Sequence, residues 1–330
     1  MGIGFSLFAV VILACVALAG VGAARFHYLF GVVIPYISGG IFILGFIWRV
    51  VKWAASPVPF HITTTCGQQK SLPWIKWSRF ENPADTLGVV VRMALEVFLF
   101  RSLFRNMKSE LKDQKLAYGS AKWLWLAGLT FHYAFLTVLV RHSRFFTEPI
   151  PFFVKWIEEL DGLFAIAVPT VYMTDVALVL AVTYLFLRRV VIPQLRYISL
   201  PADYFPLFLI LGIAITGIIT RHFSKVDLLG VKNLAMGLFT FKPVVPDGIG
   251  LAFFVHLFLV CVLVAYFPFS KLMHMGGIFL SPTRNMTGDS RRKRHVNPWN
   301  YPVKVHTYEE YENEFRDKMI QAGLPVEKRE

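Results

Sequence analysis

Six long apolar stretches restrict what this sequence can fold into. A helix needs about 20 apolar residues to cross the hydrocarbon core of a bilayer. With 55% hydrophobic residues in 330, the chain is too apolar for soluble domains and too often interrupted by charge for one continuous core. We therefore predict an all-helical, multi-pass protein of the cell membrane with six transmembrane helices. The predicted spans are about 3–24, 29–48, 121–141, 164–187, 204–221 and 249–270.

Positive charge is concentrated in three of the connections between these stretches. Of the Lys and Arg residues, 11 lie between 49 and 120, three between 188 and 203, and 11 from 271 onward. The net charge of +13 could indicate nucleic-acid binding, but Lys and Arg also accumulate beside the cytoplasmic ends of membrane spans. This distribution predicts that both termini are cytoplasmic and that the chain has no nucleic-acid partner.

Two segments outside the spans are also expected to contain helices. Charges interrupt the apolar run at 86–105, which favours a cytoplasmic amphipathic segment, about 86–118, over a seventh span. In the C-terminal tail, 276–330, Thr307 and Glu310 form a capping box ahead of an apolar stripe at helical spacing. A solvated tail is one interpretation, but the stripe favours a helix that docks on a cytoplasmic partner.

Four histidines lie at matching depths on two of the predicted spans. His132 and His142 are ten residues apart, and His256 and His274 are eighteen apart. Ionisable residues in membrane spans are usually functional, and imidazole is a common axial ligand of haem iron. Each could instead be a packed or interfacial side chain, but four in this arrangement favour ligation of two b-type haems. Two histidines fill both axial positions of an iron, which favours electron transfer over oxygen chemistry.

The predicted topology sets the pairing of these histidines. The third and sixth spans are antiparallel, which pairs His142 with His256 at an outer haem and His132 with His274 at an inner haem. Eighteen helical residues return to nearly the same face with a rise of roughly 27 Å, whereas ten rotate by about 80° and rise roughly 15 Å. Tilted helices or haems, or a break near Pro268, could absorb this difference. Each imidazole is expected to donate its other ring N–H to a carbonyl, a hydroxyl or water.

Several charged residues near the predicted haems are candidates for further roles. Arg141, Arg144 and Lys271 could pair with haem propionates, although cations at span ends commonly extend to the interface. Asp175 falls at the predicted centre of the fourth span, where an ionised carboxylate is costly without a partner. It could be protonated and hydrogen-bonded, or it could belong to a proton path. His222, at the outer end of the fifth span, is a candidate substitute ligand or quinone contact.

The cysteines argue against an iron–sulfur cluster within this chain. Cys15, Cys66 and Cys261 are far apart and form no C-x-x-C motif. Any such cluster would therefore belong to a partner.

The histidine spacing resembles that of the gamma subunit of respiratory nitrate reductase, over about residues 30–275. Residues 35–42 are also similar to the first span of that family, which makes 1–27 an additional N-terminal transmembrane helix before a diheme cytochrome b domain at 28–275. The resemblance implies a helical bundle with two b-type haems in the pairing given above. It also implies a quinone pocket beside the outer haem, near His142, Arg144 and Lys155.

Four short segments resemble a more specific family, the DsrM membrane cytochromes of the redox complex associated with dissimilatory sulfite reductase. This resemblance implies electron exchange with menaquinone and with a cytoplasmic iron–sulfur subunit of the DsrK type, which is related to heterodisulfide reductase. It also implies further membrane and periplasmic subunits, and a role in dissimilatory sulfur metabolism. The segments are RHSRFF at 141–146, FSKLMHM at 269–275, SPTRN at 281–285 and NYPVKVHTY at 300–308.

Two alternatives remain open. The chain could be the cytochrome b subunit of a heterodisulfide or nitrate reductase, which the copurifying soluble subunit would reveal. It could also be a transporter or membrane anchor whose histidines are structural. That alternative predicts no b-type absorption bands.

Overall fold

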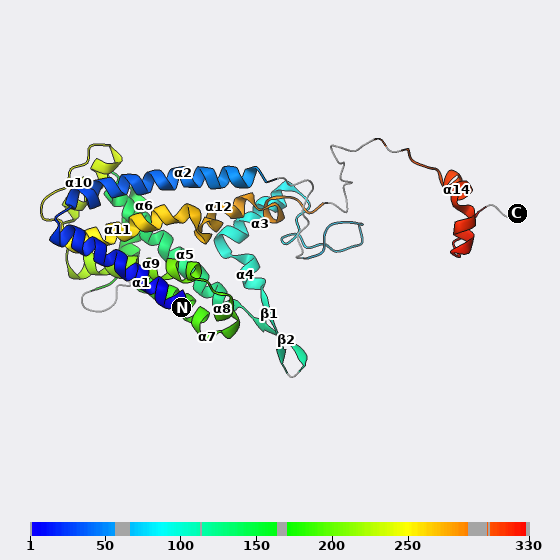
Figure 1. Cartoon of the computed structure of the whole chain (residues 1–330), viewed down its shortest axis with the longest axis horizontal. Helices are drawn as coiled ribbons and strands as arrows, with labels where there is room; N and C mark the ends of the chain where they lie inside the picture. The colour runs from blue at the N-terminus through cyan, green and yellow to red at the C-terminus, as the bar shows by residue number, and fades with distance from the viewer. Residues whose placement is uncertain are drawn as a thin grey trace.

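The long apolar stretches form helices that lie side by side in one elongated bundle (Figure 1). The computed structural model describes residues 2–56, 67–112, 114–163, 170–289, 302 and 304–327. On the second long helix, Ile43, Leu44 and Ile47 are exposed, as expected of a surface that faces lipid. The predicted all-helical membrane fold is confirmed, apart from one short hairpin. Five helices in the described part are long and apolar enough to cross a membrane: Gly2–Ala23, Leu29–Ala54, Lys122–Phe145, Pro201–Phe223 and Leu251–Phe269.

Each of these helices combines a regular α-helix with a shorter turn of different pitch at one end. Three of the turns are π-helical and two are 3₁₀. The α-helices, each with its turn, are α1 (Gly2–Ala17) with Leu18–Ala23, α2 (Ile34–Ala54) with Leu29–Val33, α5 (Lys122–His142) with Ser143–Phe145, α9 (Pro201–Ile218) with Ile219–Phe223, and α11 (Leu251–Tyr266) with Phe267–Phe269.

The predicted fourth span corresponds to α7 (Met173–Val191), which packs against α5 and α9 and is followed by α8 (Pro193–Ile198). It has 19 residues, but Asp175 lies in its first turn and Arg188 and Arg189 lie in its last turn. These charges suit the helix dipole, and they make α7 less apolar than the other five helices. Residues 164–169, where the predicted span begins, lie outside the described residues. A count of six spans stays a prediction.

Two groups of buried apolar side chains hold the bundle together. The larger group joins α1, α9 and α11 to the segment before α2, with Leu209 and Leu259 at its centre. α10 (Leu228–Phe239) adds Leu234 to this group. The smaller group joins α5, α7 and α9 and includes Leu178 and Val182. The helices are therefore joined by apolar contacts along the sides that face one another, and α9 contributes to both groups.

The long helix that contains α11 ends near Pro268, where the sequence predicted a possible break. Pro268 lies in the 3₁₀ turn that ends the long helix, and Ser270 is extended, with a φ of −109° and a ψ of 176°. A second 3₁₀ turn, Lys271–Met273, leads into α12 (His274–Leu280). Because proline disrupts helical hydrogen bonding, His274 begins a separate short helix. It does not continue the predicted span that carries His256.

Residues 86–105, predicted as one amphipathic helix, form two helices. These are α3 (Thr86–Leu99) and α4 (Arg101–Arg105), and Phe100 separates them in a left-handed conformation with a φ of 49°. An antiparallel hairpin of β1 (Met107–Lys112) and β2 (Lys115–Ser120) follows. The hairpin was not predicted, because large apolar residues are few in both of its strands.

The two charged residues of α3, Arg92 and Glu96, are buried, whereas several of its apolar residues, such as Leu87 and Phe98, are exposed. Arg92 is buried and donates hydrogen bonds to the backbone carbonyls of Glu81, Arg284 and Met286. The last two carbonyls belong to the segment around α13 (Pro282–Asn285). The charge that interrupts the apolar run therefore attaches α3 to the SPTRN segment, whereas residues such as Leu87 remain exposed.

The tail ends in α14 (Tyr308–Gln321), and Figure 1 shows it apart from the bundle. The predicted capping box is confirmed, because Thr307 Oγ1 accepts from the Glu310 amide while the Glu310 carboxylate accepts from the Thr307 amide. Cys66 and residues 300, 301 and 303 of the tail motif lie outside the described residues.

Candidate functional site

The structure brings the four histidines together in the two pairs that antiparallel spans predict. The ring centroids of His142, at the end of α5, and His256, on α11, are 6.3 Å apart. Those of His132, on α5, and His274, the first residue of α12, are 5.9 Å apart. We call these the outer pair and the inner pair, after the predicted topology. The break at Pro268 removes the difference in rise, because α11 does not run straight on to His274.

All four imidazoles are held in the same way. In each ring Nδ1 lies within hydrogen-bonding distance of a backbone carbonyl, and a carbonyl only accepts, so Nδ1 carries the proton and Nε2 keeps its lone pair. No hydrogen bond to these four Nε2 atoms occurs among the described residues. The Nδ1-to-oxygen distances are 2.7 Å from His132 to Gly128, 2.7 Å from His142 to Val138, 3.1 Å from His256 to Ile213 and 2.9 Å from His274 to Lys271.

The spacing of the rings suits one metal ion between each pair. A metal–imidazole bond is about 2 Å long, and a ring nitrogen lies about 1 Å from the centroid of its ring. Two imidazoles that bind one metal from opposite sides should therefore have centroids roughly 6 Å apart. Within the described residues, no group of three or more His, Cys, Asp and Glu could hold a metal. Two protein ligands do not complete a zinc or iron–sulfur site. Two imidazoles would be sufficient for a haem, because its porphyrin supplies the remaining ligands.

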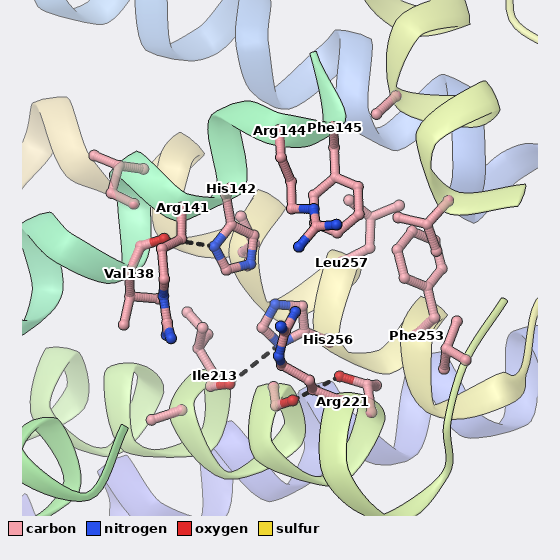
Figure 2. A pocket seen from close by; sticks show the side chains of 18 of the residues that line it. Val138, Arg141, His142, Arg144, Phe145, Ile213, Arg221, Phe253, His256 and Leu257 are labelled. Atoms are coloured by element: carbon pink, nitrogen blue, oxygen red, sulfur yellow. Dashed lines mark hydrogen bonds between the residues drawn. The ribbon is translucent and has the colours of Figure 1, made fainter. Parts of the chain in front are cut away.

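A cavity of about 440 Å³ is lined by both histidines of the outer pair. Its walls are mostly apolar and come from α5, α9, α10 and α11, and Figure 2 shows the two rings close together within it. The guanidinium groups of Arg144 and Arg221 extend into the same space from opposite sides. A water-poor cavity of this volume is typical of a site for a cofactor or small ligand.

Two residues of α9 shape the position of the His256 ring. A Cβ atom at Gly217 would lie 3.1 Å from His256 Cε1, so only glycine leaves the ring its present place. Thr216 Oγ1 lies 3.1 Å from His256 Nδ1 and donates its own proton to the Gly212 carbonyl. The ring therefore has a hydroxyl as a second acceptor beside the Ile213 carbonyl.

The inner pair has a different setting. Phe100, between α3 and α4, and Phe131 each place a ring 4.9 Å from the His132 ring, in edge-to-face geometry. Ser270 Oγ accepts from the Leu272 amide and caps the 3₁₀ turn whose Lys271 carbonyl holds His274. The inner pair thus depends on the α3–α4 junction and on the 3₁₀ turn Lys271–Met273, both at the predicted cytoplasmic end of the bundle.

A buried ionic cluster lies next to the outer pair. Arg141 donates to Asp161, on α6 (Phe152–Leu163), at 2.6 Å and to Asp175 at 2.7 Å. The other Asp175 oxygen lies 3.3 Å from His222 Nε2. The predicted place of Asp175, at the centre of a span, is wrong: α7 begins at Met173, so Asp175 lies in the first turn. There the helix dipole and Arg141 stabilise its negative charge.

Tyr172 connects this cluster with a second cationic group. The Arg141 guanidinium lies 4.4 Å from the centroid of its ring, and the Arg221 guanidinium lies 4.7 Å from it. Its hydroxyl accepts a 2.6 Å hydrogen bond from Arg221. Stacking on an aromatic ring favours charged guanidinium groups in a dry environment, so both arginines are fixed beside the outer pair.

The other predicted contacts are distributed more widely. Arg144 lines the 440 Å³ cavity and pairs with Glu158 at 2.6 Å, whereas Lys271 is exposed and pairs with Asp203 at 2.6 Å. Lys155 is exposed on α6 and does not line the 440 Å³ cavity. His222 lines a second cavity of about 420 Å³.

Arg221 was not among the predicted site residues, although it lines both cavities. The only signal in the sequence is its place next to His222. In the π-helical turn Ile219–Phe223, consecutive side chains point in different directions, so Arg221 reaches the outer pair and His222 reaches Asp175.

Comparison with known proteins places this geometry in a family. Residues 88–287 match the nitrate reductase gamma subunit family. An "Hdr-like menaquinol oxidoreductase cytochrome b-like subunit" of Archaeoglobus fulgidus is 48% identical over 278 residues, which cover 82% of this chain and 83% of the relative. A protein of the same description from Archaeoglobus profundus is 42% identical over 275 residues, which cover 81% of each chain.

Proposed function

The chain belongs to the nitrate reductase gamma subunit family, and from this premise we propose that it is a membrane diheme cytochrome b. In this proposal it exchanges electrons between menaquinol and a cytoplasmic iron–sulfur subunit. The names of the relatives, which are menaquinol oxidoreductase subunits, support the quinol as substrate and a multi-subunit complex as the setting.

One observation carries the proposal: two facing histidine pairs, each with Nδ1 held by a backbone carbonyl and Nε2 left for a metal. When bound, a b-type haem supplies one-electron exchange at each pair. His142 and His256 would hold the outer haem, and His132 and His274 the inner haem. The carbonyl contacts fix the tautomer and the ring orientation, which makes each imidazole a stronger ligand.

The cations near the outer pair have separate tasks in this proposal. Arg141 is engaged by two carboxylates, and Lys271 by Asp203. Arg144 and Arg221 extend into the cavity and are the better partners for haem propionates or for a quinone carbonyl. The apolar walls keep water away from the redox site, which strengthens every electrostatic contact within it.

A more specific assignment extends this proposal. The RHSRFF, FSKLMHM and SPTRN segments support a cytochrome of the DsrM type that works with a DsrK-like iron–sulfur subunit in dissimilatory sulfur metabolism. In the structure the SPTRN segment lies against α3, where it forms part of a folded surface at the end of the bundle that carries the inner pair. With both termini cytoplasmic, this surface and α14 would face the soluble partner.

The test is to purify the protein in detergent with its native partners. We expect two b-type haems per chain by pyridine haemochrome analysis, b-type bands in the reduced-minus-oxidised spectrum, and reduction of these haems by a menaquinol analogue. A copurifying iron–sulfur subunit of the heterodisulfide-reductase type would support the DsrM assignment, and one of the nitrate-reductase type would contradict it. A colourless, iron-free chain would refute the cytochrome and favour the transporter or anchor alternative.

A further inference from the structure

We propose that Asp175 and His222 form a proton relay that carries the protons released by quinol oxidation from the 440 Å³ cavity to the second, 420 Å³ cavity. This inference rests on the proposed function. It assigns a task to the one buried acid–imidazole contact found among the described residues.

The reaction needs such a relay. A quinol that becomes a quinone gives up two electrons and two protons, and an iron with both axial positions filled by imidazole takes only electrons. The protons must therefore pass to a side chain or to water. The cavity walls are almost entirely apolar, so water is a poor acceptor at this place.

Most polar side chains that line the cavity cannot accept a proton. Arginine stays charged at all relevant pH values, which excludes Arg141, Arg144 and Arg221. His142 and His256 use Nδ1 to donate and Nε2 for the metal. Two carboxylates remain in the described lining, Glu158 and Asp175.

Asp175 is the better placed of the two carboxylates. Glu158 pairs with Arg144 through Oε1, and no imidazole contacts it within the described residues. Asp175 uses Oδ1 for Arg141 and directs Oδ2 at His222 Nε2, 3.3 Å away. One oxygen is thus fixed and the other is free to exchange a proton.

His222 connects this carboxylate to a more polar space. Its side chain is 9% exposed and that of Asp175 is 12% exposed, so both are largely shielded from bulk solvent. The second cavity is lined by His222 together with Tyr172, Arg221 and Lys225. The Asp175–His222 contact therefore lies between an apolar compartment and a polar one.

The surrounding charges favour the transfer of one proton at a time. Arg141 with Asp161 and Asp175 carries a net charge of −1, and a proton on the Asp175–His222 pair neutralises this group. Arg221, which also stacks on the Tyr172 ring, and Lys225 add positive charge at the second cavity. These cations oppose accumulation of a second proton, so each proton leaves before the next arrives.

Each electron that the quinol gives up is accompanied by one proton. The quinol O–H bond breaks and its proton forms a bond to Asp175 Oδ2, while the electron goes to the b-type haem of the proposed function. The Oδ2–H proton then moves to His222 Nε2, which makes an imidazolium. The imidazolium loses its Nδ1 proton to water in the second cavity, and the ring then returns to the Nδ1–H tautomer, so that Nε2 can accept the next proton. Two such cycles convert one quinol into one quinone.

The test compares Asp175→Asn and His222→Ala with the unaltered complex. We expect both variants to keep two haems with unchanged dithionite-reduced spectra, and to slow haem reduction by a menaquinol analogue at least tenfold. Added imidazole should restore most of the rate in His222→Ala. His27→Ala, which removes an imidazole that packs edge-to-face against Phe254 of α11, is the matched control and should show neither loss nor rescue.

A second measurement does not depend on turnover. The reduction potential of the outer haem should fall with rising pH in the unaltered protein, because a proton on the relay stabilises the added electron, and this dependence should disappear in His222→Ala. Wild-type rates in both variants, or a slow His222→Ala that imidazole does not rescue, would overturn the relay. If Asp175→Asn loses haem, the rate of haem reduction in His222→Ala, with and without added imidazole, decides whether the relay exists. An unaltered complex without haem would instead refute the proposed function.

Discussion

The outer and inner pairs use the same ligand chemistry but are assembled differently. His142 and His256 lie on two regular helices beside a large apolar cavity, and a third helix, α9, supplies the carbonyl and hydroxyl that orient His256. In the inner pair His274 begins a short helix after a broken segment, and Phe100 from the α3–α4 junction covers its partner. The outer site is thus a product of helix packing, whereas the inner site depends on elements outside the spans.

This difference suits the two proposed tasks. A quinol that arrives from the bilayer needs an apolar cavity with an outlet for protons, and the outer pair has both. A soluble iron–sulfur partner needs an inner haem near the end of the bundle, and the place of His274 on the short helix α12, beyond the long helix α11, suits this need. Changes at the two pairs should therefore have separate consequences.

The largest expected effect is the loss of one whole haem. Changing either histidine of a pair to Ala removes an axial ligand, so His142→Ala and His256→Ala should each lose the outer haem, and His132→Ala and His274→Ala the inner one. Pyridine haemochrome analysis should give about half the original haem, and redox titration should show which potential has disappeared. His222→Ala should keep both haems. Loss of different haems by His142→Ala and His256→Ala would contradict the pairing.

The features of this site that follow from the spacing and direction of the helices could be predicted, and those that depend on individual contacts between residues far apart in the sequence could not. The pairing follows from helix direction and residue spacing alone, so it could be predicted, and Pro268 marked the break. The orientation of α3 could not be predicted. Its apolar run suggests that the apolar side chains are buried, but the buried side chain is Arg92, which binds carbonyls almost 200 residues away. The hairpin has no apolar alternation to reveal it.

Residues that act across helices were equally difficult to predict. Arg221 and Gly217 matter because α9 passes close to α7 and α11, and a single sequence contains no signal for that approach. Asp175 was noticed as a costly charge, but its partners Arg141 and His222 lie 34 and 47 residues away. Their contact depends on where α7 begins.

The next largest effect should be a loss of stability centred on the outer pair. Arg141→Gln leaves Asp161 and Asp175 buried without their cation, and breaking a buried ion pair in this way costs roughly 3–5 kcal/mol. We expect a clearly lower thermal midpoint, and release of the outer haem before the inner one on heating. Haem absorbance followed during a thermal ramp would measure both.

Lys232→Gln is the matched control for this change. Its pair with Glu148 is partly exposed, with side-chain exposures of 18% and 63%, and Lys232 does not line the cavity of the outer pair, so its removal should cost only about 1 kcal/mol. Equal destabilisation by the two variants would show that the Arg141 cluster does not support the outer site.

A pair of glycine substitutions distinguishes the two sites with the smallest chemical change. Gly217→Ala places a methyl group 3.1 Å from His256 Cε1, so the ring must move, and a disturbed ligand orientation typically costs roughly 10–100-fold in metal affinity. Gly128→Ala, beside the inner pair, meets nothing closer than Leu103 Cδ2 at 3.7 Å and keeps the carbonyl that holds His132. Haem content and electron paramagnetic resonance spectra should change at the outer haem in the first variant only. A change in both would mean that the close contact at Gly217 is not the cause.

The smallest effect should come from the second acceptor of His256. Thr216→Val keeps the shape of the side chain but removes a hydroxyl 3.1 Å from Nδ1, while the Ile213 carbonyl still accepts the same proton. One neutral hydrogen bond contributes about 1 kcal/mol, so we expect a small shift in the potential of the outer haem and full haem content. Ser270→Ala should shift only the inner potential, because Ser270 caps the turn that holds His274. Redox titration of both variants separates the two cases, and a Thr216→Val shift at the inner haem would show that the two sites are coupled more strongly than their separate contacts predict.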